Sequence, residues 1–330
     1  MILLLTDTND SHADHIVKLL QASTIPYYRM NLDKTSLQAT SCIYDGLDFK
    51  LIQNEKCLNA SDVQCVWNRK SFAALSPLDT DDELPDAKLW RHEWNRLLSG
   101  LYDHLKDLPW LNFWRLSLIA GNKYLQMRAA SVLGFNLPEF IVSNDQAVLK
   151  EFALRHPAVV LKLMHQDFYK IPEMPPQVLF VNKITNADLE RFGGLEENPI
   201  VLQQYIEKSY EVRYTVVGSR HFACKIDSQA SAIANTDWRR YDVPHTPHLP
   251  IEPPPEIRHK VDELMKTLEL HYGALDFIVD PQGDWYFLEI NPDGQYLWIE
   301  ELTGLPISSA IVEWFTDKLQ NKNQYESICN

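Results

Sequence analysis

The sequence lacks the residue patterns that several classes of protein require. It has five cysteines, Cys42, Cys57, Cys65, Cys224 and Cys329. They form no CxxC pair and no cluster with histidine, which is typical of reduced thiols in a cytoplasmic protein. No apolar run approaches the roughly 20 residues that a membrane-spanning helix needs. The apolar start at Ile2–Leu5 has no basic segment before it, so we expect neither a signal peptide nor a membrane protein.

Basic residues are also in the minority. Lys and Arg total 31 against 45 Asp and Glu, which gives a formal net charge of −14. A general nucleic-acid binder needs clustered Lys and Arg for phosphate contacts, so we expect no nucleic-acid partner. The acidity is compatible with a basic peptide partner and equally with solubility alone. The sequence contains no P-loop and no GxGxxG, and those two nucleotide-binding architectures therefore find no support.

The chain is long enough to bury a substantial core without disulfides. At 330 residues and 45% hydrophobic, its length indicates two or three compact units. A buried strand at Ile2–Leu5, an amphipathic helix at Ser11–Gln21 and a strand at Tyr27–Met30 open the chain. This order predicts a parallel crossover and an N-terminal α/β unit. A long helix at Asp86–Leu105 leads to its expected end near residue 110.

Two further units are predicted after residue 110. Helices and short strands alternate up to about residue 200, with a helix at Asn122–Leu133 and a strand at Val159–Met164. The part after residue 200 is rich in strands, and the four-residue turn near Asp280–Asp284 predicts a hairpin of Leu275–Val279 with Trp285–Ile290. The expected division is therefore 1–110, 111–200 and 201–330.

The predicted hairpin carries the most informative side chains. Because side chains alternate between the two faces of a strand, Glu289 and Asn291 point the same way, and Asp276 can face them from the partner strand. The opposite, apolar face then carries Leu275, Phe277, Leu288 and Ile290. Two carboxylates this close repel each other unless a cation lies between them. Oxygen ligands of this kind suit Mg²⁺, which binds one or two carboxylates together with substrate phosphates.

The spacing of Asp276 and of Leu288-Glu-Ile-Asn-Pro292 resembles the magnesium site of ATP-grasp enzymes, which clasp ATP between two α+β subdomains. The resemblance implies an ATP-grasp fold of the α/β class, with a pre-ATP-grasp domain at 1–110, a central subdomain at 111–200 and a C-terminal subdomain at 201–330. It implies ATP and Mg²⁺ as cofactors, and these metal ligands: Asp276, Glu289 and Asn291. It also implies that Lys123 and Lys162 contact phosphate, and a phosphate would supply the counter-charge that a lysine among apolar neighbours needs.

The segment Val201-Leu-Gln-Gln-Tyr-Ile206 resembles the family's hinge strand, whose backbone groups read adenine. The resemblance implies that the nucleotide contacts Gln203, Gln204, Tyr205 and Ile206. The family usually has an acidic residue where Gln204 stands, and an amide oxygen can still accept a hydrogen bond from the adenine amino group. Glu207 and Glu211 are both candidates for the ribose hydroxyls. Glu211 is favoured because it begins the next strand.

Three basic residues are candidates for activating the substrate: Arg213, Lys225 and Arg239. Arg213 alternates with Glu211 and therefore shares its face of the strand. The planar fork of arginine suits carboxylates and phosphates, so Arg213 and Arg239 are candidates for holding an acyl phosphate. Preorganised cations of this kind stabilise the charge on a transferring phosphoryl group.

Further motifs resemble one branch of the superfamily. Trp67-Asn-Arg-Lys70, Asn112 and Asp237-Trp-Arg239 are similar to motifs of the graspetide (microviridin-type) synthetases, which are ATP-grasp maturases of ribosomal peptides. The resemblance implies a precursor peptide as the partner, with Asp or Glu side chains activated as acyl phosphates and joined to Ser, Thr or Lys in ω-ester or ω-amide rings. A leader segment would tether the peptide. Ester versus amide chemistry, ring number and order, the leader-binding residues and a homodimer stay open.

Three other functions share parts of this pattern. A small-molecule carboxylate–amine ligase of the glutathione synthetase or ribosomal-modification type would use the same ATP residues with a different partner. A nucleotide-binding module without ligase activity would have little use for Arg213 and Lys225 beside three metal ligands. A kinase on this fold would leave a stable phosphorylated product, without loss of water.

Overall fold

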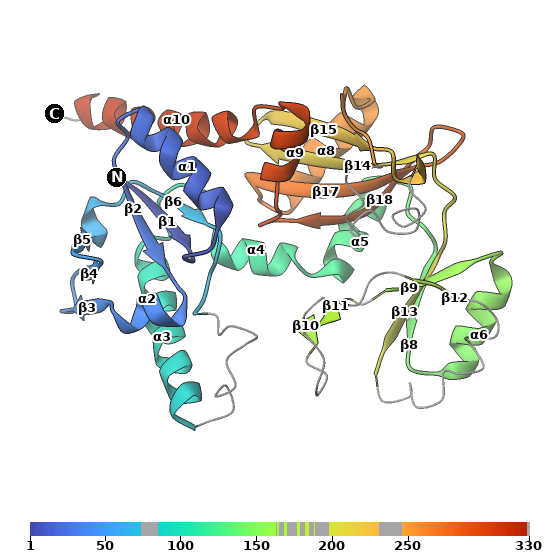
Figure 1. Ribbon diagram of the computed structural model, residues 1–330, viewed down its shortest axis with the longest axis horizontal. Coiled ribbons are helices and arrows are strands. Elements are labelled where there is room, and N and C mark those ends of the chain that lie inside the picture. Colours follow the sequence, from blue (N-terminus) through green and yellow to red (C-terminus); the bar gives the residue numbers. More distant parts are fainter. Residues whose placement is uncertain are drawn as a thin grey trace.

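We analysed a computed structural model that describes residues 1–73, 85–162, 198–230 and 246–328, together with 164, 168–169, 177–178, 182–184 and 188. Its three larger sheets occupy separate regions of the molecule, with the N-terminal sheet at one end and the other two at the opposite end (Figure 1). Helices alternate with strands along the chain, as an α/β protein requires.

The N-terminal sheet is built around a strand that is apolar throughout. Leu3 and Leu5 of β1 pack into one core cluster and Ile2 and Leu4 into another, because helices cover both faces of a parallel sheet. The parallel pairing of β1 with β2 confirms the predicted crossover. The sheet order is β2 (Tyr27–Asn31), β1 (Ile2–Thr6), β6 (Cys65–Asn68) and β7 (Trp110–Leu111).

The helices of this unit begin where the sequence caps them. Helix α1 (Ser11–Ala22) starts after Asp10, whose carboxylate accepts hydrogen bonds from the N–H groups of His12 and Ala13. Its residues Ile16 and Leu20 cover one face of the sheet. The rest of the unit comprises α2 (Lys34–Gln38), the antiparallel sheet of β3 (Ser41–Tyr44), β4 (Phe49–Gln53) and β5 (Lys56–Asn59), the short helix η1 (Ala60–Asp62), and α3 (Pro85–His104).

The central sheet is antiparallel and carries one helix on its outer face. Leu149 and Phe152 of α6 pack against Val159, Ile200 and Leu202. The strand order is β12 (Asn182–Ile184), β9 (Val159–Lys162), β13 (Ile200–Gln204) and β8 (Phe140–Ser143). The other elements that the structure describes in this part are α4 (Trp114–Ala120), α5 (Lys123–Val132), α6 (Gln146–Arg155), and the pair β10 (Phe168–Tyr169) and β11 (Gln177–Val178).

One face of the C-terminal sheet is apolar, and the other carries charged side chains as well as apolar residues, such as Phe222, Cys224 and Ile226, that belong to a different core cluster. Val212, Tyr214, Leu275 and Phe277 form the apolar face, which packs against α8. The strand order is β16 (His248–Ile251), β15 (Arg220–Ile226), β14 (Tyr210–Val217), β17 (Tyr272–Val279) and β18 (Trp285–Asn291). The helices are η3 (Ser228–Ala230), α8 (Pro255–Thr267), α9 (Leu297–Thr303) and α10 (Ile307–Ile328).

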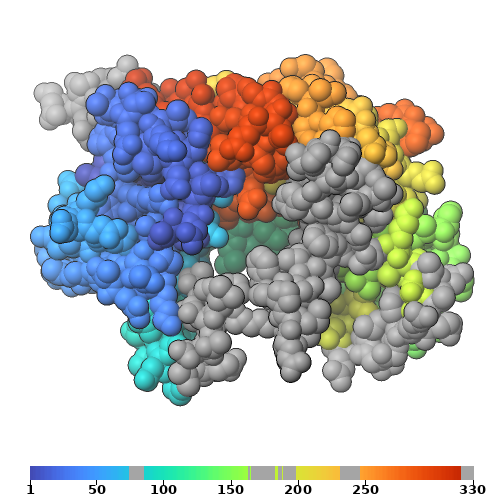
Figure 2. Space-filling view, viewed as in Figure 1, coloured from blue at the N-terminus to red at the C-terminus, as the bar shows by residue number. Residues whose placement is uncertain are grey.

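The two ends of the chain share a core. Ile16 and Trp67 of the N-terminal unit belong to the same buried cluster as Ile311 and Phe315 of α10. Figure 1 shows α10 lying along α1, and Figure 2 shows their atoms, red and blue, in contact. The N-terminal sheet extends to Leu111, and β13 belongs to the central sheet, so the chain passes between the central and C-terminal sheets after Gln204. The three-domain division itself stays a proposal.

Candidate active site

The C-terminal hairpin brings the predicted metal ligands to one face of its sheet. Asp276 on β17 pairs directly with Glu289 on β18, and Asn291 stands two residues further along the same strand. The register shifts between Asp276 and Phe277, and the extra residue on β18 interrupts its alternation. Phe287 therefore joins Ile290 in the apolar core in place of Leu288. The expectation that Leu288 lies on the apolar face is wrong for this reason.

Each of the two carboxylates has a cationic partner. Arg213 Nη1 lies 3.0 Å from Asp276 Oδ1, because these residues pair across β14 and β17. Lys123 Nζ lies 2.8 Å from Glu289 Oε2, because α5 begins at Lys123 and packs against β18. The Arg213–Asp276 side chains are only 8% and 10% exposed, so removing either one would leave a buried charge without its partner.

The loop that follows β18 is held by side chains from distant parts of the chain. Four successive backbone carbonyls accept hydrogen bonds: Pro292 from Asn112 at 2.9 Å, Asp293 from Arg69 at 2.8 Å, Gly294 from Tyr272 at 2.7 Å and Gln295 from Arg213 at 3.0 Å. A Cβ atom on Gly294 would lie 2.5 Å from Ala274 Cβ, so glycine is required at this close approach. At about 1 kcal/mol for each hydrogen bond, these contacts fix the loop beside the predicted metal ligands.

Arg69 extends this loop contact into the N-terminal unit. Its Nε lies 3.3 Å from Asp10 Oδ2, and both side chains are less than a tenth exposed. Burial by itself would lower the pKa of Arg69, but the Asp10 carboxylate, together with Tyr272, Asp293 and Tyr296, raises it above its usual value, which keeps the guanidinium charged. Asp10 also caps α1. One carboxylate therefore ties the first helix of the chain to the loop of residues 292–295.

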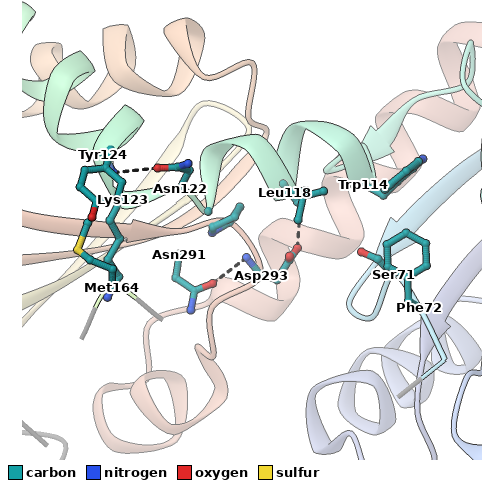
Figure 3. A pocket seen from close by; sticks show the side chains of 13 residues that line it. Ser71, Phe72, Trp114, Leu118, Asn122, Lys123, Tyr124, Met164, Asn291 and Asp293 are labelled. Atoms are coloured by element: carbon teal, nitrogen blue, oxygen red, sulfur yellow. Dashed lines mark hydrogen bonds between the residues drawn. The ribbon is translucent and has the colours of Figure 1, made fainter. Parts of the chain in front are cut away.

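A cavity of about 500 Å³ opens beside this loop. Figure 3 shows that its lining comes from distant parts of the chain, which include Ser71 and Phe72 after β6, Trp114 on α4, Lys123 at the start of α5, Met164, and Asn291 and Asp293 at the end of β18. Ser117 Oγ donates to Asp293 Oδ1 at 3.3 Å. Burial raises the pKa of Asp293 to about 6, against the opposing influence of Arg69 and Ser117.

The predicted ligands fit a hard divalent cation. They supply two carboxylates and one amide on adjacent positions of one sheet face, and all three donors are oxygens of the kind that Mg²⁺ prefers. Among the described residues, no three His, Cys, Asp or Glu side chains gather as a possible metal cluster. The set therefore depends on the Asn291 amide as its third ligand, which matches the sequence pattern.

The predicted phosphate contacts lie on two different elements. Lys123 is at the cavity, paired with Glu289 as described. Lys162 is the last residue of β9, on the face opposite the one that α6 covers, since Val159 and Leu161 face α6. Met164, two residues further, lines the cavity together with Lys123. Lys123 therefore lines the cavity, whereas the contact of Lys162 with phosphate stays a prediction.

Some polar groups of the strand that is predicted to contact adenine already form hydrogen bonds within the fold. Gln203 is buried and pairs with Val160, on the same face as Lys162. The Gln204 N–H donates to Glu139 O at 2.7 Å, and its side-chain Oε1 accepts from Glu139 N at 3.3 Å. The Tyr205 N–H donates to Ala158 O at 3.0 Å. The Tyr205 N–H is therefore already used within the fold, and the adenine contact through the backbone near Tyr205 and Ile206 stays a prediction.

The two candidates for the ribose differ sharply in environment. Glu207 is exposed, whereas Glu211 is buried and its Oε1 lies 2.6 Å from Lys208 Nζ. Glu211 also shares the sheet face of Arg213, as its place two residues earlier on β14 predicts. The structure thus places Glu211 on the side of the metal ligands, and its ribose role stays a prediction.

One of the predicted substrate-activating residues is not brought to this face. Lys225 pairs with Val212 and lies on the apolar side of the sheet, with Nζ 4.5 Å from the centre of the Tyr210 ring. The residue of β15 that pairs with Arg213 is Cys224, which directly precedes Lys225. The side on which Lys225 falls depends on this register, which the sequence does not reveal. Arg239 lies outside the described residues, as does the whole segment 231–245.

Sequence reasoning gave no site role to Arg69, Ser117 or Asp293. Arg69 contacts a backbone more than two hundred residues away, and no local pattern signals such a contact. Ser117 lies on α4, a short helix that the sequence did not predict. For Asp293 a signal was present, because it directly follows the motif Leu288-Glu-Ile-Asn-Pro292.

No family model matches the chain, and no curated protein does. A RiPP-associated ATP-grasp ligase of Chryseobacterium gregarium, solved with ADP and a leader and core peptide, is 30% identical, covers 96% of each chain and has a TM-score of 0.84. The macrocyclase MdnC of Microcystis aeruginosa MRC, solved with its precursor peptide MdnA, is 27% identical over 96% of this chain and 99% of its own, with a TM-score of 0.83. The ATP-grasp ligase PsnB, solved with a precursor variant, Mg and ADP, is 15% identical over 96% and 98%, with a TM-score of 0.77, and supports the fold alone.

The fold and the constellation on β14, β17 and β18 define an ATP-grasp ligase. With 30% identity over nearly the full length of both chains, the protein belongs to the RiPP-associated ATP-grasp ligases. The predicted family, the α/β ATP-grasp fold and the prediction of a ligase are confirmed. No helix in the part of the chain that the structure describes has the length and apolar character to span a membrane.

Proposed function

We propose that this ligase uses ATP to activate Asp or Glu side chains of a ribosomal precursor peptide as acyl phosphates, and joins them to Ser, Thr or Lys side chains in ω-ester or ω-amide rings. The observation that carries the proposal is the paired set of Asp276, Glu289, Arg213 and Lys123, of which Lys123 lines a cavity of about 500 Å³. Two solved relatives at 27–30% identity bind a precursor or core peptide, which favours a peptide over a small-molecule substrate.

The phosphate side of the reaction is assigned to the residues around β18. Asp276, Glu289 and Asn291 would hold Mg²⁺, which when bound neutralises charge on the nucleotide phosphates. Lys123 and Lys162 would contact the phosphates. Arg213 would keep Asp276 ionised and in place, and its positive charge lies on the face where the acyl phosphate forms.

The adenine and the ribose are assigned to the end of β13 and the start of β14, where the chain passes from the central sheet to the C-terminal sheet. The Ile206 backbone and the Gln204 amide would read adenine, since the Tyr205 N–H is already committed to Ala158. Glu211 would accept hydrogen bonds from the ribose hydroxyls. The Lys208 ammonium, 2.6 Å away, orients that carboxylate. Gln203 would pack below the base as part of the same face.

The test uses the short peptide encoded beside the gene for this chain, together with ATP and Mg²⁺. The peptide mass should fall by one water for each ring, and ADP should appear in the same ratio. The Glu289→Ala variant should produce neither, while the Asp284→Asn variant, changed in the exposed turn of the same hairpin, should match the wild type. An unchanged peptide mass with ADP formed only when small amino acids are supplied would favour the small-molecule ligase instead.

A further inference from the structure

One carboxylate at the cavity has no part in the phosphate chemistry proposed above. Asp293 lines the cavity beside Asn291, and the apolar wall opposite comes from Phe72 and Trp114 (Figure 3). The volume of about 500 Å³ lies within the range of sites that enclose a ligand group. A side chain that enters here meets an apolar surface for its methyl or methylene groups and a carboxylate for its polar end. It also lies next to a proposed metal ligand.

Asp293 is fixed by contacts on its backbone and on one carboxylate oxygen. Its carbonyl accepts from Arg69 at 2.8 Å, its N–H donates to Asn291 Oδ1 at 3.0 Å, and its Oδ1 accepts from Ser117 at 3.3 Å. No described residue donates a hydrogen bond to its Oδ2, which therefore keeps its capacity as an acceptor. The position of this acceptor is set by the same loop that positions Asn291.

We propose that Asp293 binds the nucleophile of the ring-closing step. The O–H of a Ser or Thr, or an N–H of a neutral Lys amine, donates to the Asp293 carboxylate, and the lone pair of that oxygen or nitrogen is thereby turned toward the acyl phosphate. This inference rests on the proposed function. In the step, the nucleophile's oxygen or nitrogen bonds to the acyl carbon, and the bond from that carbon to the phosphoryl oxygen breaks. The electron pair and the nucleophile's proton leave with inorganic phosphate, and Asp293 is unchanged.

The proposal separates two reactions of one enzyme. Formation of the acyl phosphate needs ATP, Mg²⁺ and the peptide carboxylate, but no nucleophile. Ring closure needs the nucleophile in place as well. Misplacement of a reacting group by about 1 Å can cost about 100-fold in rate, so loss of Asp293 should slow ring closure and spare activation.

The experiment follows both reactions in the full chain with ATP, Mg²⁺ and the short peptide encoded beside its gene. Hydroxylamine traps the acyl phosphate as a hydroxamate, and loss of water reports the ring. Asp293→Ala should form hydroxamate within about 2-fold of the wild type and rings about 100-fold more slowly. Asp293→Asn, which keeps an acceptor oxygen, should recover at least about 10-fold of that loss. Peptides with Thr and with Lys at the reacting position test the hydroxyl and the amine separately.

Three results would overturn the inference. Undiminished ring closure in Asp293→Ala would remove Asp293 from nucleophile binding. An equal loss of hydroxamate and rings in both variants would make Asp293 a structural residue. A higher Mg²⁺ requirement for hydroxamate formation would make it a metal ligand. A wild type that forms neither hydroxamate nor rings would refute the proposed function itself, which distinguishes the two failures; Asp284→Asn serves as the matched control.

Discussion

The two walls of the candidate site are held together in different ways. The C-terminal wall, formed by β14, β17, β18 and the loop of residues 292–295, is fixed by buried side-chain contacts that reach from Arg69, Asn112 and Arg213. The central wall, formed by β9 and β13, is fixed by strand pairing and by packing against α6. Its proposed nucleotide contacts, such as Lys162, stand at the end or on the surface of a strand.

Because of this difference, the stability of the fold and the binding of the nucleotide should depend on different residues. On the C-terminal wall the charged side chains that are proposed to act in catalysis also hold the structure, because they are buried and paired. On the central wall the charged side chain of Lys162 is half-buried at a strand end, and its loss should affect nucleotide binding more than folding. Substitutions on the two walls should therefore have different signatures.

The largest effect is expected from breaking the buried pair on the C-terminal wall. Arg213→Met should lower the free energy of unfolding by about 3–5 kcal/mol, because it leaves Asp276 buried without its partner. Urea unfolding at pH 7 measures this change. Arg220→Met is the matched control, since Arg220 on β15 pairs with Glu313 at the surface and should cost less than about 1 kcal/mol. A loss below about 1 kcal/mol for Arg213→Met would mean that the wall does not depend on this pair.

The central wall should respond in the opposite way. Lys162→Met should weaken binding of a non-hydrolysable ATP analogue about 10- to 100-fold, which corresponds to about 1.4–2.7 kcal/mol. Its free energy of unfolding should change by less than about 0.5 kcal/mol. Titration calorimetry and urea unfolding give the two numbers. Unaltered affinity would take Lys162 out of the nucleotide site, and a large loss of stability would erase the contrast between the walls.

A pH effect is expected from His12, which lies close to Asp10 and Arg69. Burial, with the Arg69 guanidinium nearby, lowers the pKa of His12 from 6.5 to about 4. The unfolded chain then binds a proton between pH 6.5 and 4 that the folded protein does not, so stability falls as the pH decreases through this window. Relative to His12→Gln, the wild type should lose about 3 kcal/mol between pH 7 and pH 4. Parallel unfolding profiles for the two proteins would show that His12 does not titrate in this way.

The smallest effect is expected at Lys225. Because it lies on the apolar side of the C-terminal sheet over the Tyr210 ring, Lys225→Met should change the rate of ring formation by less than about 2-fold. Steady-state kinetics with the precursor peptide measure this change. A 100-fold loss would restore the role that the sequence suggested and would contradict the observed strand register.

The sequence predicts the parts of this molecule that depend on local pattern. The first strand and helix, the hairpin and the shared face of Glu289 and Asn291 follow from alternation and capping, and the structure confirms them. The bulge at Leu288 and the place of Lys225 depend on strand register, which is set by partners elsewhere in the chain.

The sequence gives still less indication of how the loop after β18 is anchored. Arg69 and Asn112 contact carbonyls more than 170 residues away, and such contacts leave no spacing in the sequence. The resemblance to known synthetases singled out Trp67-Asn-Arg-Lys70 and Asn112 without saying what they do. In the structure, Arg69 and Asn112 both donate hydrogen bonds to the loop that carries Asp293 and hold it in place.

The central claim is that Asp276, Glu289 and Asn291 together bind the divalent ion that accompanies ATP. A crystal grown with Mn²⁺ and a non-hydrolysable ATP analogue tests it directly, because the anomalous signal of Mn²⁺ locates the ion without ambiguity. The account predicts a peak in contact with all three side chains and with phosphate oxygens. A nucleotide-bound crystal in which the peak lies elsewhere, while Asp276 and Glu289 contact only Arg213 and Lys123, would contradict it.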